Sequence, residues 1–115
     1  MEISEQFEEG YVILQLDGEL DASSAIPLNH KIKDLFDKEH YRILFDFEDL
    51  AYISSAGLGV FISILKDFKE KQGFLGFYNM SEMVHDVFRI VGLDKVLAIY
   101  DDKPTALDHL NAWTA

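Results

Sequence analysis

Hydrophobic and polar residues alternate along the chain with two periods, one typical of strands and one typical of helices. Runs rich in β-branched and aromatic residues predict strands at 2–7, 11–16, 41–47, 74–79 and 96–100. Apolar residues at helical spacing, bounded by capping residues, glycines or prolines, predict helices from about Ala25, over 56–71, over 81–92 and over 102–113. The acidic residues and glycine at 8–10 predict a hairpin turn that leaves 2–7 as an edge strand.

The first predicted helix is bounded by a pair of serines and a proline. Ser23 or Ser24 supplies the N-cap oxygen, and Pro27 is tolerated only in the first turn, so we expect a start at about Ala25. Residues 48–53 either continue the preceding strand or lead out of it. The positions expected to be buried on the first three helices are Ile26, Leu28, Ile32, Leu35 and Phe36; Leu58, Phe61, Ile62, Leu65 and Phe68; and Met83, Val84, Val87, Phe88 and Val91.

The order of elements is strand, strand, helix, followed by three strand–helix pairs. Strands that alternate with helices indicate parallel crossover units, so we expect an α/β fold with a mixed sheet and about four helices packed on it. The short apolar run at 41–47 predicts a central strand covered on both faces. The length of 115 residues predicts one domain over 1–115 with a radius of gyration of roughly 13 Å.

Charge and composition then narrow the classes of partner. The chain carries 21 acidic residues against 10 Lys and Arg, a net charge of −11, which argues against nucleic acid and anionic membrane surfaces. It is compatible with a basic protein partner. Without cysteine, a membrane-length apolar run or a signal peptide, the sequence predicts a soluble cytoplasmic protein.

The stretch AYISSAGLGVF at 51–61 is the candidate for chemistry. Ser54 and Ser55 precede an apolar helix, where a serine oxygen caps the free amides of the first turn. A phosphate-binding loop would need a lysine or a third glycine, and neither is present. A nucleophile elbow needs glycine two residues before the serine, where this chain has Ile53, although His85 and His109 lie downstream.

Metal chemistry is similarly disfavoured, because the four histidines (His30, His40, His85 and His109) lack close ligand spacing. Asp46, Glu48 and Asp49 could coordinate a hard cation, but solvated acids at a strand end are the simpler interpretation. We therefore expect no metal, no cofactor and no catalytic residue.

Capping does not account for Gly57 and Gly59, each of which costs a helix about 1 kcal/mol relative to alanine. Their presence indicates a close approach at the helix start. A helix N-terminus also tolerates a phosphate group, and phosphorylation of Ser55 would add about −1.5 to −2 charge there. The stretch suits a switch in which a partner binds the bare serine and not the phosphoserine.

Three segments resemble one known family in order and spacing: GELDASSA at 18–25, ILFDFEDLAYISSAGLGVF at 43–61 and VFRIVGLDKVLAIYDDKPTALDHL at 87–110. The sequence resembles the bacterial STAS-domain anti-anti-sigma factors nearly from end to end. The resemblance implies a STAS fold and the role of anti-sigma factor antagonist. It implies binding to an anti-sigma factor serine kinase, and this binding frees a sigma factor for transcription. Phosphorylation by that kinase breaks the complex, and a PP2C-like, metal-dependent phosphatase restores it.

The family motif is commonly Asp-Ser-Ser/Thr-Gly-Leu-Gly, with the first serine modified. This correspondence implies that Ser55 is the phosphoacceptor, with Ser54 as the second candidate because it occupies the aspartate position. The implied partner-binding residues are Asp21, Ser54, Ser55, Ala56, Gly57, Leu58 and Gly59. The missing aspartate leaves an alternative, a non-phosphorylated scaffold subunit of a transporter or stress-signalling complex. The oligomeric state, monomer or weak dimer, stays open.

Overall fold

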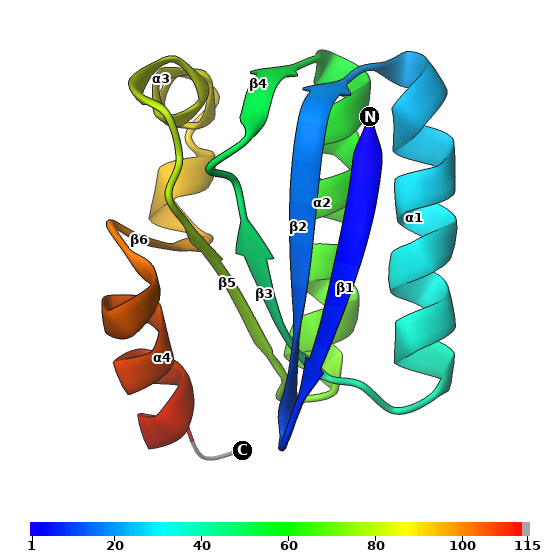
Figure 1. Ribbon diagram of the computed structural model, residues 1–115, viewed down its shortest axis with the longest axis vertical. Helices are drawn as coiled ribbons and strands as arrows, with labels where there is room; N and C mark the ends of the chain where they lie inside the picture. The colour runs from blue at the N-terminus through cyan, green and yellow to red at the C-terminus, as the bar shows by residue number, and fades with distance from the viewer. Residues whose placement is uncertain (114–115) are drawn as a thin grey trace.

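The computed structural model describes residues 1–113, so the last two residues of the expected domain lie outside the described range. Its elements follow the predicted order, with one additional strand (Figure 1). They are β1 (Glu2–Glu8), β2 (Tyr11–Leu20), α1 (Ala22–Asp37), β3 (Arg42–Asp46), β4 (Leu50–Ile53), α2 (Ser55–Glu70), β5 (Phe74–Tyr78), α3 (Glu82–Ile90), a 3-10 turn η1 (Leu93–Lys95), β6 (Ala98–Tyr100) and α4 (Lys103–Ala112). The expected α/β fold with a mixed sheet is confirmed.

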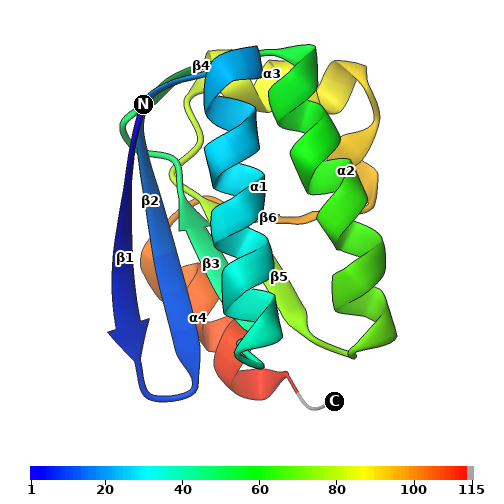
Figure 2. The ribbon, with the colours of Figure 1, turned by 90° about the vertical axis from the view of Figure 1, so that its right-hand side faces the viewer.

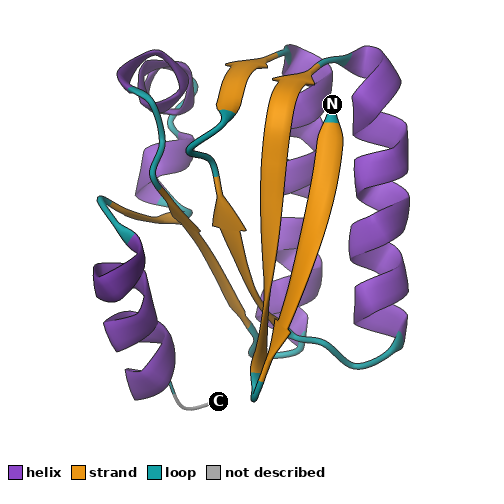
Figure 3. Cartoon of the chain, in the orientation of Figure 1, coloured by secondary structure: helices purple, strands orange, loops and turns teal. Residues whose placement is uncertain are grey.

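The strands form one sheet in the order β1-β2-β3-β5-β6, with β4 beside β2 (Figure 3). β1 is the antiparallel edge strand, whereas the other neighbours run parallel. β2 is long enough to pair with β3 along its first half and with β4 along its second half. Residues 48–53 therefore lead out of β3 into a separate strand. The register shifts at Gly18, whose φ of +116° suits glycine.

Helices cover both faces of the sheet (Figure 2). α1 and α2 lie on one face, where a cluster of phenylalanines fills the core together with α3. Phe45, Phe61 and Phe77 have ring centroids 5.2 Å apart, and Phe47 and Phe88 complete the cluster. α4 lies on the other face over a smaller apolar cluster. The radius of gyration is 12.9 Å, close to the expected value. Within residues 1–113, no helix is long and apolar enough to cross a membrane.

The start of α1 differs from the prediction. Asp21, rather than Ser23 or Ser24, is the N-cap, so the helix begins at Ala22 and Pro27 lies inside it. The Asp21 carboxylate accepts the amides that would otherwise lack a partner, which makes the earlier start possible. Pro27 is exposed in the second turn.

The earlier start changes which face of α1 is buried. Ala25 faces the core, whereas Ile26, expected to be buried, is exposed.

Three further apolar positions expected in the core are also exposed: Ile62 on α2, and Met83 and Val91 around α3. Ile62 and Met83 directly adjoin the buried Phe61 and Val84, and Val91 is the C-cap of α3, so the expected apolar stripe was too wide. The last strand begins at Ala98 rather than at 96, because η1 and its following turn occupy the preceding residues.

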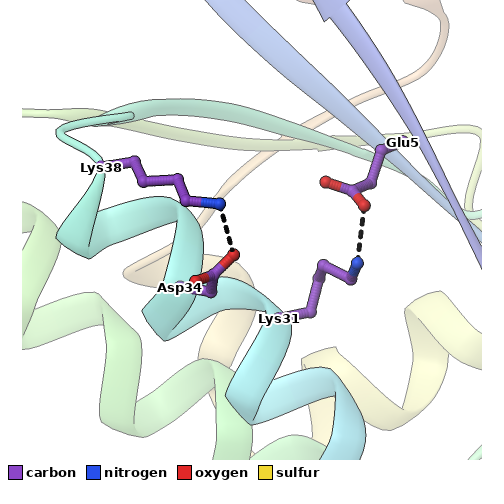
Figure 4. Close-up of polar contacts among 4 residues, drawn as sticks. All are labelled: Glu5, Lys31, Asp34 and Lys38. Atoms are coloured by element: carbon purple, nitrogen blue, oxygen red, sulfur yellow. Dashed lines mark hydrogen bonds and ion pairs between the residues drawn. The ribbon is translucent and has the colours of Figure 1, made fainter.

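The edge strand β1 is joined to α1 by an ion pair. Lys31 Nζ lies 2.6 Å from Glu5 Oε1, whereas the pair between Lys38 and Asp34 lies within α1 (Figure 4). Acidic residues along β1 also discourage pairing with another strand.

The C-terminal helix is fastened to β3 by one guanidinium group. Arg42 Nη2 donates to the carbonyl of Leu110 at 2.6 Å, and Nη1 donates to that of Trp113 at 3.3 Å. The indole of Trp113 donates to the carbonyl of Gln72 at 3.1 Å. A cation thus satisfies the last carbonyls of α4, where the helix dipole favours positive charge.

We predict that Arg42→Met lowers the free energy of unfolding by about 2 kcal/mol, because it removes charged donors from two carbonyls of α4. Urea denaturation measures this loss. Arg89→Met is the matched control, since its exposed pair with Asp86 contributes less than about 0.5 kcal/mol. Equal losses in the two variants would contradict the prediction.

Candidate functional site

The N-termini of α1 and α2 lie side by side at one edge of the sheet (Figure 2). They do so because β2 and β4 are parallel neighbours in which Leu20 pairs with Ile53. The amide of Ser54 donates to the carbonyl of Leu20 at 2.8 Å, and each strand then turns directly into its helix. Two helix N-termini, each with partial positive charge, therefore share one surface.

Asp21 caps the first of these helices. Its carboxylate accepts the amides of Ser23 and Ser24, each at 3.0 Å, and the Ser24 hydroxyl accepts the Asp21 amide at 2.9 Å. Hydrogen bonds from Ser23, above all from its hydroxyl at 2.7 Å, and from Ser24 lower the pKa of Asp21 to about 2. Asp21 therefore carries a full negative charge at neutral pH.

Ser54 and Ser55 have different environments. Ser54 is the N-cap of α2, is partly buried, and its Oγ accepts the amide of Gly57 at 3.2 Å. Ser55 is the first residue of α2, and Ser55 and Ala56 are both exposed. The structure thus brings Asp21 and both serines to one surface, with Ser55 the more accessible of the two hydroxyls.

The two glycines of the motif also differ. Gly57 is buried, and a Cβ there would lie 2.7 Å from Leu20 Cγ and 3.0 Å from Ile53 Cγ1. Gly59 is exposed, and a Cβ there would meet no atom within 4 Å. Gly57 is therefore required by packing inside the domain. At Gly59, by contrast, no side chain projects from the exposed surface of α2. Leu58 between them is buried in the core.

Small residues of both helices form a shallow groove of about 300 Å³ next to Ser55. Its lining residues are Ala22, Ala25, Ile26, Asn29, Ala56, Gly59, Val60 and Ser63. Sequence reasoning did not identify the α1 side of this groove. The available signal was the spacing of Ala22, Ala25 and Asn29, which places small or polar residues on one helix face.

The acids at the end of β3 bond to their own loop, to β2 and to the residue that follows β5. Asp46 Oδ1 accepts the Glu48 amide at 3.0 Å and the side-chain amide of Asn79 at 3.4 Å. Asp49 accepts the side-chain amide of Gln15 at 3.0 Å. In the described part of the chain, no group of three or more His, Cys, Asp or Glu residues could hold a metal ion.

The fold and this edge define a small α/β domain that presents two capped helix starts on one surface. The sequence model of the STAS domain matches residues 2–106, so the chain belongs to the STAS domain family. The family expectation drawn from the sequence is thereby confirmed.

Relatives and solved structures agree with this assignment. The anti-sigma-B factor antagonist of Bacillus subtilis is 34% identical over 92 residues, which cover 79% of this chain and 83% of that protein. The crystal structure of TM1081 from Thermotoga maritima superposes with a TM-score of 0.91 at 26% identity, covering 95% and 94% of the two chains. The structure of the Bacillus protein SpoIIAA in its phosphorylated form has a TM-score of 0.74 at 22% identity, covering 95% and 99%; that likeness shows the fold.

We predict opposite effects for alanine at the two glycines. Gly57→Ala lowers the free energy of unfolding by about 1–2 kcal/mol, because the methyl group overlaps buried Leu20 and outweighs the gain in helix propensity. Gly59→Ala raises it by up to about 1 kcal/mol, because its Cβ meets open space. Denaturant unfolding of both variants tests this, and a destabilising Gly59→Ala would contradict it.

We also predict an acid-dependent contribution from Asp21. Because folding lowers its pKa from 3.8 to about 2, the ionised cap stabilises the fold above the unfolded-state value and loses that contribution as the pH falls from about 4 to about 2. Urea denaturation of the protein and of Asp21→Asn, which keeps a neutral capping oxygen, measures the difference at each pH. A difference that stays constant down to about pH 2 would contradict this.

Proposed function

We propose that this chain is an anti-sigma factor antagonist that binds an anti-sigma factor through the adjoining N-termini of α1 and α2. The observation that carries the proposal is the exposed Ser55 in the first turn of α2, beside the groove between the two helices. The names of the curated relatives support it. The chain then acts by binding and performs no catalysis itself.

Phosphorylation of Ser55 is the proposed switch. The anti-sigma factor is then also a serine kinase, and the Ser55 Oγ takes the γ-phosphoryl group of its bound ATP while ADP leaves. The free amides of the first turn and the helix dipole accommodate the added negative charge within this domain. A partner seated over Ala56 and Gly59 would face added bulk and charge next to ionised Asp21. A PP2C-like phosphatase would reverse the modification.

The environments of the two serines favour Ser55 as the acceptor. Ser54 replaces the aspartate of the family motif and keeps its capping function, because its Oγ accepts the Gly57 amide. Its hydroxyl is therefore committed to the helix start and partly buried, while Ser55 is exposed. The replacement removes one negative charge from this surface and leaves the cap in place.

We predict that Ser55→Asp weakens binding to the cognate anti-sigma kinase by roughly 100-fold or more, through like-charge repulsion and bulk. Ser55→Ala binds like the unmodified protein, because the hydroxyl serves only as the acceptor. Calorimetry measures both affinities. Mass spectrometry after incubation with kinase and ATP should place the phosphate on Ser55.

Ser81→Asp is the control, because Ser81 caps α3 and aspartate is an equally good N-cap. This variant adds the same charge at another helix start and should bind normally. Unchanged affinity of Ser55→Asp would contradict the switch and favour a constitutive scaffold. Phosphate on Ser54 alone would contradict the assignment of the acceptor.

A further inference from the structure

A row of polar side chains crosses four strands on the face of the sheet that carries α4. The strand registers pair Ser4 with Gln15, Gln15 with Asp46, and Asp46 with Tyr78. Residues paired in this way project from the same face, so the row runs from β1 through β2 and β3 to β5. It lies on the opposite side of the sheet from α1 and α2, because Tyr78 packs in the cluster under α4, whereas Leu14 and Leu16 pack in the cluster under α1 and α2.

The row borders an apolar region that α4 covers. On the same face, Ile13, Leu44 and Phe74 pack against Ala106 and Leu110 of α4. The row itself lines an open pocket of about 260 Å³, with Ile13 among its apolar walls. Lys103, the first residue of α4, closes the pocket from the side of the helix. The polar row thus lines a cavity, while Gln15 and Asp46 also bond to Asp49 and Asn79.

Three charged side chains line this pocket, and one of them, Glu5, pairs with Lys31 of α1 at 2.6 Å. Among residues 1–113, none of the ion pairs includes Asp46 or Lys103. Asp46 uses Oδ1 to accept from the Glu48 amide and the Asn79 side chain, whereas Oδ2 accepts no hydrogen bond from the described residues. An anionic and a cationic group in one small cavity can each bind the opposite end of a zwitterion.

Tyr78 adds a hydrogen-bond donor. The residue as a whole is 1% exposed, yet it lines the pocket, and its hydroxyl is not among the buried side-chain atoms of residues 1–113 that lack a partner. Burial and the neighbouring Asp46 raise the pKa of Tyr78, so the hydroxyl stays protonated at neutral pH. The hydroxyl can therefore donate to an acceptor in the pocket.

We propose that this pocket binds a small zwitterion of the free amino acid class. The ammonium group of the ligand pairs with Asp46, and its carboxylate accepts from Lys103 and the Tyr78 hydroxyl. Gln15 and Ser4 supply further polar contacts along the row. The volume suits a compact molecule, since it lies just below the usual range for ligand pockets of about 300–1,000 Å³.

The test uses the isotope-labelled protein and each proteinogenic amino acid in turn, up to about 10 mM, which detects millimolar affinities. At least one amino acid should shift the backbone amide signals of Gln15, Asp46, Tyr78 and Lys103 in a saturable manner. Asp46→Asn and Lys103→Met should each weaken its binding by roughly tenfold or more, because each removes one charged contact. Asp46→Asn keeps an oxygen that accepts the bonds from Glu48 and Asn79, so the fold is retained.

Lys95→Met is the matched control, since Lys95 is exposed in η1 and lies outside the pocket. It should bind the same amino acid with unchanged affinity. Absence of saturable shifts with every amino acid would overturn the proposal. Equal affinities of Lys103→Met and Lys95→Met would also overturn it, as would binding of the neutral polyol inositol at this pocket with similar affinity.

Discussion

The parallel pairing of β2 with β4 is the constraint on which the proposed switch surface depends. Because the Ser54 amide donates to the Leu20 carbonyl, the two strands end together and their helices begin together. Gly57 then lets α2 approach until its backbone rests on Leu20 and Ile53. A larger residue there would move the helix and separate the two N-termini. The close approach inferred from Gly57 and Gly59 is thus, at Gly57, a contact within the domain.

The motif divides its residues between the interior and the surface. Ser54 and Gly57 face the domain and hold the helix start, whereas Ser55 and Gly59 are exposed. A chemical change at Ser55 therefore leaves the cap intact and alters only what a partner meets. The same division explains how serine serves at position 54, where the family resemblance implies an aspartate, since capping needs an oxygen acceptor and no charge.

Local features of the sequence predicted most elements, while pairings between distant segments escaped it. Periodicity and cap residues placed α2 and α3 within a residue or two, because both signals act within a few turns. Asp21 was missed as a cap because two serines follow it and Pro27 argued for a later start. The separate strand β4 could not be predicted, because its partner β2 lies some thirty residues away. The polar row could not be predicted for the same reason, because only the pairing of distant strands brings its residues together.

The sheet separates the two proposed binding surfaces. The cluster of Phe45, Phe47, Phe61, Phe77 and Phe88 fills the side of α1 and α2, while the polar row lies on the other side. Close-packed interiors tolerate little change in volume. Because the packed sheet stands between the two surfaces, exposed residues of one surface can change without repacking the other. One strand nevertheless serves both surfaces, because β2 carries Gln15 in the pocket and ends in Leu20 beneath α2. Substitutions within β2 are therefore more constrained than those at Ser55 or Lys103, since they disturb both surfaces together.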